Sequence, residues 1–303
     1  MAGRRGGAGG VGERAAAAIA GLVIRALRAM DPVRCSNLGG RLARRVGPLL
    51  PVSRVADRNL RAALPDLDDA ARRAVIAGVW ENLGRTAAEL PHLARFGRTP
   101  SGPGWEIEGE QHLAALREGG QAIFFSGHFG NWELILPIAA SLGVRVAGIY
   151  RAASNAPIDA VIQAMRARAL GPGVAMFPKG TAGARGAMLH LRAGGSLGLL
   201  VDQKMNDGIA APFFGRPAMT APALAMFARH FDLPVIPVRV VRLAPARFRL
   251  ICEAPMHFPR TEARDADILR ITTTVNATLE RWVRQDPAAW LWLHRRWPKS
   301  EDG

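Results

Sequence analysis

The chain has 303 residues and a formal net charge of +15, and 49% of its residues are hydrophobic. This length and this apolar content are enough for a large hydrophobic core, and they exclude a wholly disordered chain. The strongest apolar run near the N-terminus covers residues 15–24, whereas a membrane-spanning helix needs about 20 apolar residues. The two cysteines, Cys35 and Cys252, suggest neither a disulfide framework nor a zinc pattern.

The positive charge is concentrated near the N-terminus. Residues 1–61 hold twelve arginines and three acidic residues, so they carry +9 of the net charge. Such asymmetry favours an anionic partner, although a GC-rich coding bias would also raise the arginine content. The sequence has no zinc finger and no aromatic RNA-binding signature, so no nucleic-acid partner is expected.

The first third of the chain is predicted to be helical. Residues 1–12 are rich in glycine and arginine and are expected to form a disordered basic tail, whereas residues 13–98 are expected to fold into helices. Within that segment, residues 66–94 have helical apolar spacing, with Asp66 or Asp68 as the candidate N-cap.

Residues 13–30 are predicted to form an amphipathic helix that ends at Asp31-Pro32. At ~100° per residue, its arginines lie within about 60° of one another, and most other positions are apolar. Such a helix can lie on a membrane surface with its arginines at the headgroups. The equally favoured alternative is a helix that packs against the protein's own core.

After a glycine- and proline-rich turn at residues 98–104, the pattern changes. Residues 105–303 alternate short apolar runs, typical of buried strands, with helical stretches. Strands are predicted at residues 121–126, 144–150, 174–177, 196–201, 235–241 and 247–253, and helices at residues 132–142, 156–170, 183–193, 222–230 and 265–284. The fold is therefore predicted to be α/β, with a mostly parallel central sheet flanked by helices and preceded by the N-terminal helical segment.

The segment SGHFGNWE, residues 126–133, follows a predicted strand and opens a predicted helix. Sites in α/β proteins gather at the carboxyl ends of parallel strands, which makes this segment the leading candidate site. Asn131 is a candidate N-cap, which would place Glu133 in the first helical turn. His128 could then fold back onto Glu133, which would hold the tautomer of a general base. The alternative is a histidine that only completes the turn.

The residues around His128 favour one kind of chemistry. No serine stands in a G-x-S-x-G motif and neither cysteine has a nearby histidine, so no nucleophile for a covalent intermediate is indicated. A lone His–Glu base suits direct attack by a substrate hydroxyl on an activated acyl group. No metal is implied, because the sequence has no H-E-x-x-H motif and no ligand cluster, and no cofactor is expected.

Several blocks along the chain, taken in order, carry a family resemblance. The blocks are GHFGNWE at residues 127–133, Tyr150-Arg151 with Asn155 and Asp159, VDQ at 201–203, PFFG at 212–215 with Ala218 and Thr220, LPVIPV at 233–238 and WLWLHRRW at 290–297. Together they resemble the bacterial lipid A biosynthesis acyltransferases, a branch of the lysophospholipid acyltransferase superfamily. Within them, the segment from His128 to Glu133 resembles the superfamily's H-x4-D/E motif. The likeness covers roughly residues 50–298.

The resemblance implies transfer of a fatty acyl chain from acyl carrier protein to a hydroxyl of an anionic, Kdo-bearing lipid A precursor. It implies a peripheral enzyme on the cytoplasmic leaflet of the inner membrane, with His128 as general base and Glu133 as its partner. Backbone N–H groups near Gly130 and Asn131 are expected to bind the oxyanion. The alternative is a related enzyme that uses acyl-CoA and another glycolipid or a lysophospholipid, such as a phosphatidylinositol mannoside.

Three basic residues are candidates for binding the acceptor's anionic groups. Arg151 follows a predicted strand, and its guanidinium suits a phosphate or a Kdo carboxylate, unless it is simply a surface arginine. Lys179 and Arg185 flank a turn that resembles the superfamily's FPEGT block, with Lys179 in place of the acid. Because of that difference, phosphate binding and a structural turn are equally favoured.

The remaining candidates are placed in the walls of the site. Asp202 and Gln203 follow a buried strand and are expected to order the active-site wall, without a direct catalytic role. Phe213 and Phe214 are expected either to line the acyl groove or to belong to the core. Four tryptophans beside arginines would suit a membrane interface. A packed C-terminal lid is favoured instead, because Trp-x-Trp spacing alternates faces: Trp282, Trp290, Trp292 and Trp297.

Overall fold

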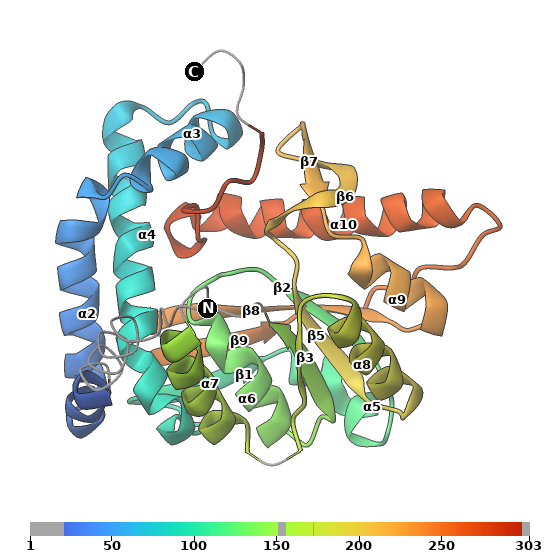
Figure 1. Ribbon diagram of the computed structural model, residues 1–303, viewed down its shortest axis with the longest axis horizontal. Helices are drawn as coiled ribbons and strands as arrows, with labels where there is room; N and C mark the ends of the chain where they lie inside the picture. Colours follow the sequence, from blue (N-terminus) through green and yellow to red (C-terminus); the bar gives the residue numbers. More distant parts are fainter. Residues whose placement is uncertain (1–20, 151–155, 172, 299–303) are drawn as a thin grey trace, which may run out of the picture.

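The computed structural model describes residues 21–150, 156–171 and 173–298. A seven-stranded sheet with helices around it forms the centre, and further helices precede the sheet in the chain (Figure 1). The predicted α/β class is confirmed. From edge to edge, the strand order is β1 (Gly104–Glu108), β9 (Arg247–Cys252), β8 (Val235–Ala244), β2 (Ile123–Ser126), β5 (Ser196–Leu200), β3 (Val146–Tyr150) and β4 (Met176–Pro178).

Most neighbouring strands run parallel, and the β8–β9 pair is antiparallel. The central strand β2 lies between β5 and β8, with Ser126 opposite Leu200 at its carboxyl end. Alternate residues of β2 enter two different core clusters, since Ile123 and Phe125 belong to one and Phe124 to the other. The segments that follow β2 and β5 therefore begin side by side at one edge of the sheet.

Every helix predicted after residue 105 is present, with ends that differ by a few residues. They are η4 (Trp132–Leu134) leading into α6 (Ile135–Ser141), α7 (Ala156–Leu170), α8 (Thr181–Arg192), α9 (Ala223–Phe231) and α10 (Arg264–Gln285), with short turns at η3 (Glu110–Leu113), α5 (Ala114–Arg117) and η5 (Pro287–Ala289). Three strands were not predicted. They are β1 and an antiparallel pair formed by β6 (Lys204–Phe213) and β7 (Arg216–Thr220).

The N-terminal segment is helical where it is described. A helix at residues 21–29 ends before Asp31, whose side chain caps the next helix by accepting a hydrogen bond from the Arg34 N–H. Asp68 caps a later helix in the same way, as predicted. The helices are α2 (Pro32–Val46), η1 (Gly47–Leu49), α3 (Ser53–Ala63), α4 (Asp69–Glu89) and η2 (Leu90–Arg95). Residues 1–20, which include the predicted tail and the start of the first predicted helix, lie outside the described residues.

Helices α2 and α4 pack closely because glycines face each other at their crossing. A Cβ on Gly39 would lie 2.5 Å from the Gly84 carbonyl oxygen, so only glycine allows this approach. Further along the chain, the Asn59 amide donates to the carbonyl oxygens of Trp292 and His294, at 2.9 and 2.8 Å. Within the described part of the chain, no helix is both long and apolar enough to cross a membrane.

Candidate active site

His128 lies in the loop after β2, and Asp202 lies just after the neighbouring strand β5. The His128 Nδ1 is 2.8 Å from Asp202 Oδ1, and the His128 backbone N–H donates to Asp202 Oδ2, also at 2.8 Å. The Asp202 side chain is fully buried and that of His128 is 15% exposed. The parallel pairing of β2 with β5 brings these residues together although 74 positions separate them.

Asp202 is held in place by a further donor from the C-terminal segment. Trp290 Nε1 donates to Asp202 Oδ2 at 2.7 Å. Gly127 provides the space for this carboxylate, because a Cβ there would lie 3.0 Å from Asp202 Oδ2. An ionised carboxylate only accepts hydrogen bonds, so His128 carries its proton on Nδ1 and leaves a lone pair on Nε2.

The pKa values of this pair shift in opposite directions. Burial alone would lower the pKa of His128, but the charge of Asp202 and its hydrogen bond outweigh burial and raise that pKa above its ordinary value. Burial acts to raise the pKa of Asp202, and the charge and hydrogen bond of His128 overcome it, which leaves that pKa well below its ordinary value. Asp202 therefore stabilises the protonated imidazole that a general base forms.

Glu133 has a different partner from the one expected. It lies in the first turn after the loop, as predicted, but its carboxylate forms two hydrogen bonds with Arg166 of α7, at 2.6 and 2.7 Å. The carboxylate that orients the ring of His128 is Asp202 instead. Glu133 acts on His128 through its charge, which adds to the rise in the pKa of that histidine.

Asn131 and Gly130 shape the loop through buried contacts. Asn131 stands at the N-cap position, but its side chain does not cap the helix and donates instead to Glu89 Oε2, at 2.9 Å. Gly130 has φ +54°, and its carbonyl oxygen accepts hydrogen bonds from Asn82 and Thr86 of α4, both at 3.0 Å. The Gly130 N–H already donates to the Ala289 carbonyl oxygen, so it is not a free oxyanion donor.

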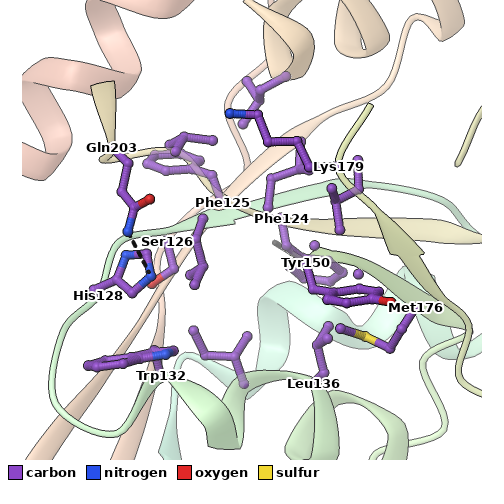
Figure 2. A pocket seen from close by; sticks show the side chains of 18 of the residues that line it. Phe124, Phe125, Ser126, His128, Trp132, Leu136, Tyr150, Met176, Lys179 and Gln203 are labelled. Carbon is purple, nitrogen blue, oxygen red and sulfur yellow. Dashed lines mark hydrogen bonds between the residues drawn. The ribbon is translucent and has the colours of Figure 1, made fainter. Parts of the chain in front are cut away.

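His128 and Glu133 both line a cavity of about 1200 Å³. Gln203 lies beside the ring, with its Nε2 3.5 Å from His128 Nε2 (Figure 2). The Trp132 ring meets the imidazole edge-on, with centroids 4.9 Å apart. Lys179 and Lys204, two of the three lysines in the chain, also line this cavity.

Much of the cavity wall is apolar and runs along the sheet away from His128. In Figure 2, Leu136 and Met176 lie at the end opposite His128 and Gln203. Gly148 and Gly198, which are paired in register on β3 and β5, line the same wall. A Cβ on Gly148 would lie 2.6 Å from Leu136 Cδ1, and one on Gly198 would lie 3.0 Å from Leu136 Cδ2. The two glycines therefore make room for Leu136.

Several predicted residues lie elsewhere. Arg185 is exposed on α8 and is not among the residues that line the cavity, and Arg151 falls outside the described residues. Phe213 and Phe214 are core residues rather than groove residues, because their rings pack against each other and against the C-terminal tryptophans. The packed C-terminal segment is confirmed, since all four of its tryptophans are buried: Trp282, Trp290, Trp292 and Trp297.

Three residues of the site were missed by sequence reasoning. Arg166 and Lys204 stand in no recognisable motif, so no local signal marks them. His294 belongs to a block that was noticed, and it lines the cavity near His128, with ring centroids 6.4 Å apart. Burial lowers the pKa of His294 despite the charge of Asp202. In the described part of the chain, no group of three or more His, Cys, Asp or Glu side chains could hold a metal ion.

Comparison with known proteins gives the family. A model of the bacterial lipid A biosynthesis acyltransferases matches residues 14–299. Among solved structures, the chain is similar to the 1-acyl-sn-glycerophosphate (LPA) acyltransferase PlsC from Thermotoga maritima, with 14% identity, a TM-score of 0.39, and coverage of 84% of this chain and 100% of that one. No curated protein matches the chain. The family match spans nearly the whole sequence, so this protein is an acyltransferase that belongs to the bacterial lipid A biosynthesis acyltransferase family.

Proposed function

We propose that the protein transfers a fatty acyl chain from acyl carrier protein to a hydroxyl of a Kdo-bearing lipid A precursor. The observation that carries this proposal is the His128–Asp202 pair, in which His128 lines a large and mostly apolar cavity. Family membership supports the acyl transfer itself. The two lysines at the same cavity support an anionic acceptor, because an ammonium group binds phosphate or carboxylate well.

In the proposed reaction, the acceptor hydroxyl lies against His128 Nε2. The imidazole takes the hydroxyl proton while the oxygen attacks the thioester carbonyl carbon, and a tetrahedral oxyanion forms. When the carbon–sulfur bond breaks, the thiolate leaves and takes the proton back from His128. Asp202 keeps Nδ1 protonated throughout and stabilises the transient imidazolium, so the reaction requires no covalent acyl-enzyme.

Gln203 is placed to serve the oxyanion. Its side-chain N–H group is 3.5 Å from the nitrogen that receives the proton, so it lies within reach of the reacting atoms. A bound hydroxyl would occupy the position next to Nε2 and leave the Gln203 N–H free to donate to the thioester oxygen. Gly130, the donor expected from the sequence, already uses its N–H in a contact with Ala289.

Glu133 and Arg166 form an ion pair that lines the same cavity. The two side chains share two hydrogen bonds and are 11 and 22% exposed. Glu133 acts on the base through its charge rather than through a hydrogen bond. The apolar remainder of the wall, around Leu136 and Met176, is the part that suits an acyl chain. Such an enzyme works where acyl carrier protein meets the lipid, at the cytoplasmic face of the inner membrane.

Mass spectrometry of lipid acceptors tests this function. Purified protein is incubated with lipid A precursors that carry or lack Kdo, and with acyl donors on either acyl carrier protein or CoA. A mass increment on the Kdo-bearing acceptor with the carrier-protein donor is expected. Preference for acyl-CoA and a phosphatidylinositol mannoside would support the alternative enzyme instead.

A histidine substitution tests the role of the base. His128→Ala should lower kcat by about 10²–10⁴-fold and leave the melting temperature close to that of the wild type. The exposed His257 provides the control, because His257→Ala should leave kcat unchanged. Full activity of His128→Ala would contradict the proposed mechanism.

A further inference from the structure

The outer side of α2 carries large apolar side chains in contact with solvent. Leu38, Leu42, Val46 and Leu49 are 54, 61, 47 and 83% exposed. The spacing of four residues places Leu38, Leu42 and Val46 on one side of α2, within about 80°. Leu49 follows them in η1. Of the thirteen large hydrophobic residues that are exposed in the described part of the chain, eight lie between residues 22 and 52.

The side of α2 next to this stripe packs against α4. Cys35 and Ser36 are completely buried, and they bond to Ala88 and Glu89 of α4. Gly39 lies against Gly84 at the crossing of the two helices. In Figure 1, α2 runs along the outer edge of the molecule with α4 on its inner side. The apolar stripe therefore borders the packed side of α2 and remains in contact with solvent.

Arginines border this stripe without a carboxylate partner. Arg34, Arg41 and Arg45 are exposed and lie within about 60° of Leu38 around the helix. Among the described residues, no ion pair involves any of the three, whereas Arg44, further around the helix, pairs with Glu81. Helix α2 itself contains no acidic residue. The outward side is thus both apolar and positively charged.

We propose that this α2 face, made by Leu38, Leu42, Val46 and Leu49 with Arg34, Arg41 and Arg45, docks on an anionic lipid bilayer. The inference extends the proposed function, whose acceptor is a membrane lipid. A bilayer satisfies both parts of the face, because the leucines enter the acyl boundary while the guanidinium groups reach the phosphates.

Other partners fit the α2 face less well. An acidic protein would pair with the arginines but would have to cover Leu49, which is 83% exposed. A second copy of the chain, packed by a two-fold axis on the same face, would bring its arginines against those of the first copy. A membrane-surface helix at residues 13–30 is one of two equally favoured predictions from the sequence. The α2 face lies beyond those residues and is described in full.

Vesicle binding of the full-length protein tests the apolar part of the face. The double variant Leu42→Ser/Leu49→Ser should bind phosphatidylglycerol-containing vesicles at least about tenfold more weakly than the wild type. The reason is that it lacks the favourable transfer of two leucine side chains from water into the bilayer. The control variant Leu189→Ser/Leu269→Ser changes two leucines that are 55 and 44% exposed on other helices. It should bind as the wild type does. Equal binding by the two double variants would overturn the proposal.

A charge variant tests the basic part. Arg34→Gln/Arg41→Gln/Arg45→Gln should weaken binding to anionic vesicles by about fivefold per arginine at low salt, and high salt should reduce the difference. Binding to phosphatidylcholine vesicles should change little. The exposed Arg216 provides the control, since Arg216→Gln should have no effect. A charge variant that binds anionic vesicles like the wild type would count against the proposal.

A fluorescent label can report the contact directly. The two native cysteines are 0 and 3% exposed, so a label attached to Leu49→Cys should be site-specific. Its emission should shift to the blue when anionic vesicles are added, and a label on Leu189→Cys should not respond. An unchanged emission at position 49 would exclude insertion there.

Two further outcomes separate this inference from its competitors. If sedimentation shows that the wild type is a dimer and that Leu42→Ser/Leu49→Ser is a monomer, the face is an interface between copies and the proposal fails. If removal of residues 1–20 abolishes vesicle binding while that double variant binds normally, it fails as well. Acyl transfer to detergent-dispersed acceptor should be the same in wild type and double variant, so loss of docking is distinguishable from failure of the proposed function.

Discussion

At the scale of single residues, the site depends on which carboxylate reaches His128. Asp202 does so because it follows β5, which is paired with β2, the strand that precedes His128. Gly127 leaves space for its carboxylate. Glu133 is closer in sequence, but its carboxylate is engaged by Arg166. Closeness in sequence predicted Glu133 as the partner of His128. The actual partner is Asp202, because β2 and β5 are neighbouring strands.

The two carboxylates predict different pH profiles. Asp202→Asn removes the charge that raises the pKa of His128 and allows the wrong tautomer, so kcat/KM should fall by about a thousandfold or more. A base acts only when unprotonated, so wild-type activity should rise with pH through the raised pKa of His128. In Asp202→Asn this acid limb should move to lower pH.

Glu133→Gln is the comparison variant for this prediction. It should move the acid limb in the same direction but less, because Glu133 contributes its charge and no hydrogen bond to the imidazole. Profiles of kcat/KM against pH measure both effects. If kcat/KM falls further in Glu133→Gln than in Asp202→Asn, Glu133 rather than Asp202 orients His128.

The contact between Gly148 and Leu136 predicts how a substitution changes the preferred length of the acyl chain. Gly148→Val would push Leu136 into the cavity, because even a Cβ at that position would lie 2.6 Å from it. The variant should therefore prefer donors with shorter acyl chains than the wild type does, as measured with a panel of acyl carrier protein thioesters. Gly97→Val should leave the preference unchanged, since no atom lies within 4 Å of a Cβ at that position. An unchanged preference in Gly148→Val would show that the acyl chain lies elsewhere.

At the scale of elements, α4 connects α2 to the loop that carries His128. One of its sides meets α2 through Gly84, and another holds the Gly130 carbonyl oxygen through Asn82 and Thr86. Buried Glu89 at the end of α4 binds Asn131 of the loop and Ser36 of α2. The geometry of the loop therefore depends on how α4 is packed.

The close crossing of α2 and α4 predicts that a larger residue at Gly84 lowers the stability of the protein. Gly84→Ala should lower the free energy of unfolding by about 1–3 kcal/mol, because its Cβ would lie 2.3 Å from the Gly39 carbonyl oxygen. The helical Gly21, which has open space around it, provides the control. Gly21→Ala should leave the stability unchanged or raise it, since alanine is the better helix former. Denaturant unfolding measures both, and a neutral Gly84→Ala would mean that the helices can move apart without cost.

At the scale of the whole molecule, segments far apart in the chain build one site. The N-terminal helices reach the C-terminal segment through Asn59, and that segment reaches Asp202 through Trp290. Aromatic packing joins the same segment to the β6–β7 hairpin through Phe213. The helical segment and the α/β part should therefore behave as one cooperative unit.

This cooperativity predicts the behaviour of a truncated chain. A fragment of residues 99–303 should fail to fold stably. It lacks the contact from Asn59 to the C-terminal segment and the contact from α4 to the loop that carries His128. Calorimetry of the full chain should show a single transition. Two separate transitions, or a soluble fragment with native near-ultraviolet circular dichroism, would contradict this expectation.

Prediction of secondary structure succeeded for most helices that follow the central strands. Helices α7, α9 and α10 lie within one or two residues of their predicted ends. The hairpin of β6 and β7 was missed because Asn206, Asp207 and Gly208 interrupt any alternation in β6, and because β7 is short. The two strands are consecutive and joined by a short turn, so their pairing is local, but no regular alternation marks it in the sequence.

The sequence by itself determined the α/β class, the family resemblance and the position of His128 at the end of a strand, because periodicity and ordered motifs are local properties of the chain. Only the tertiary structure decided the partner of His128, the pairing of Glu133 with Arg166, and the burial of Phe213 and Phe214. It also decided which side of α2 remains exposed. These outcomes depend on strand order and helix packing, which bring together residues that no local pattern connects.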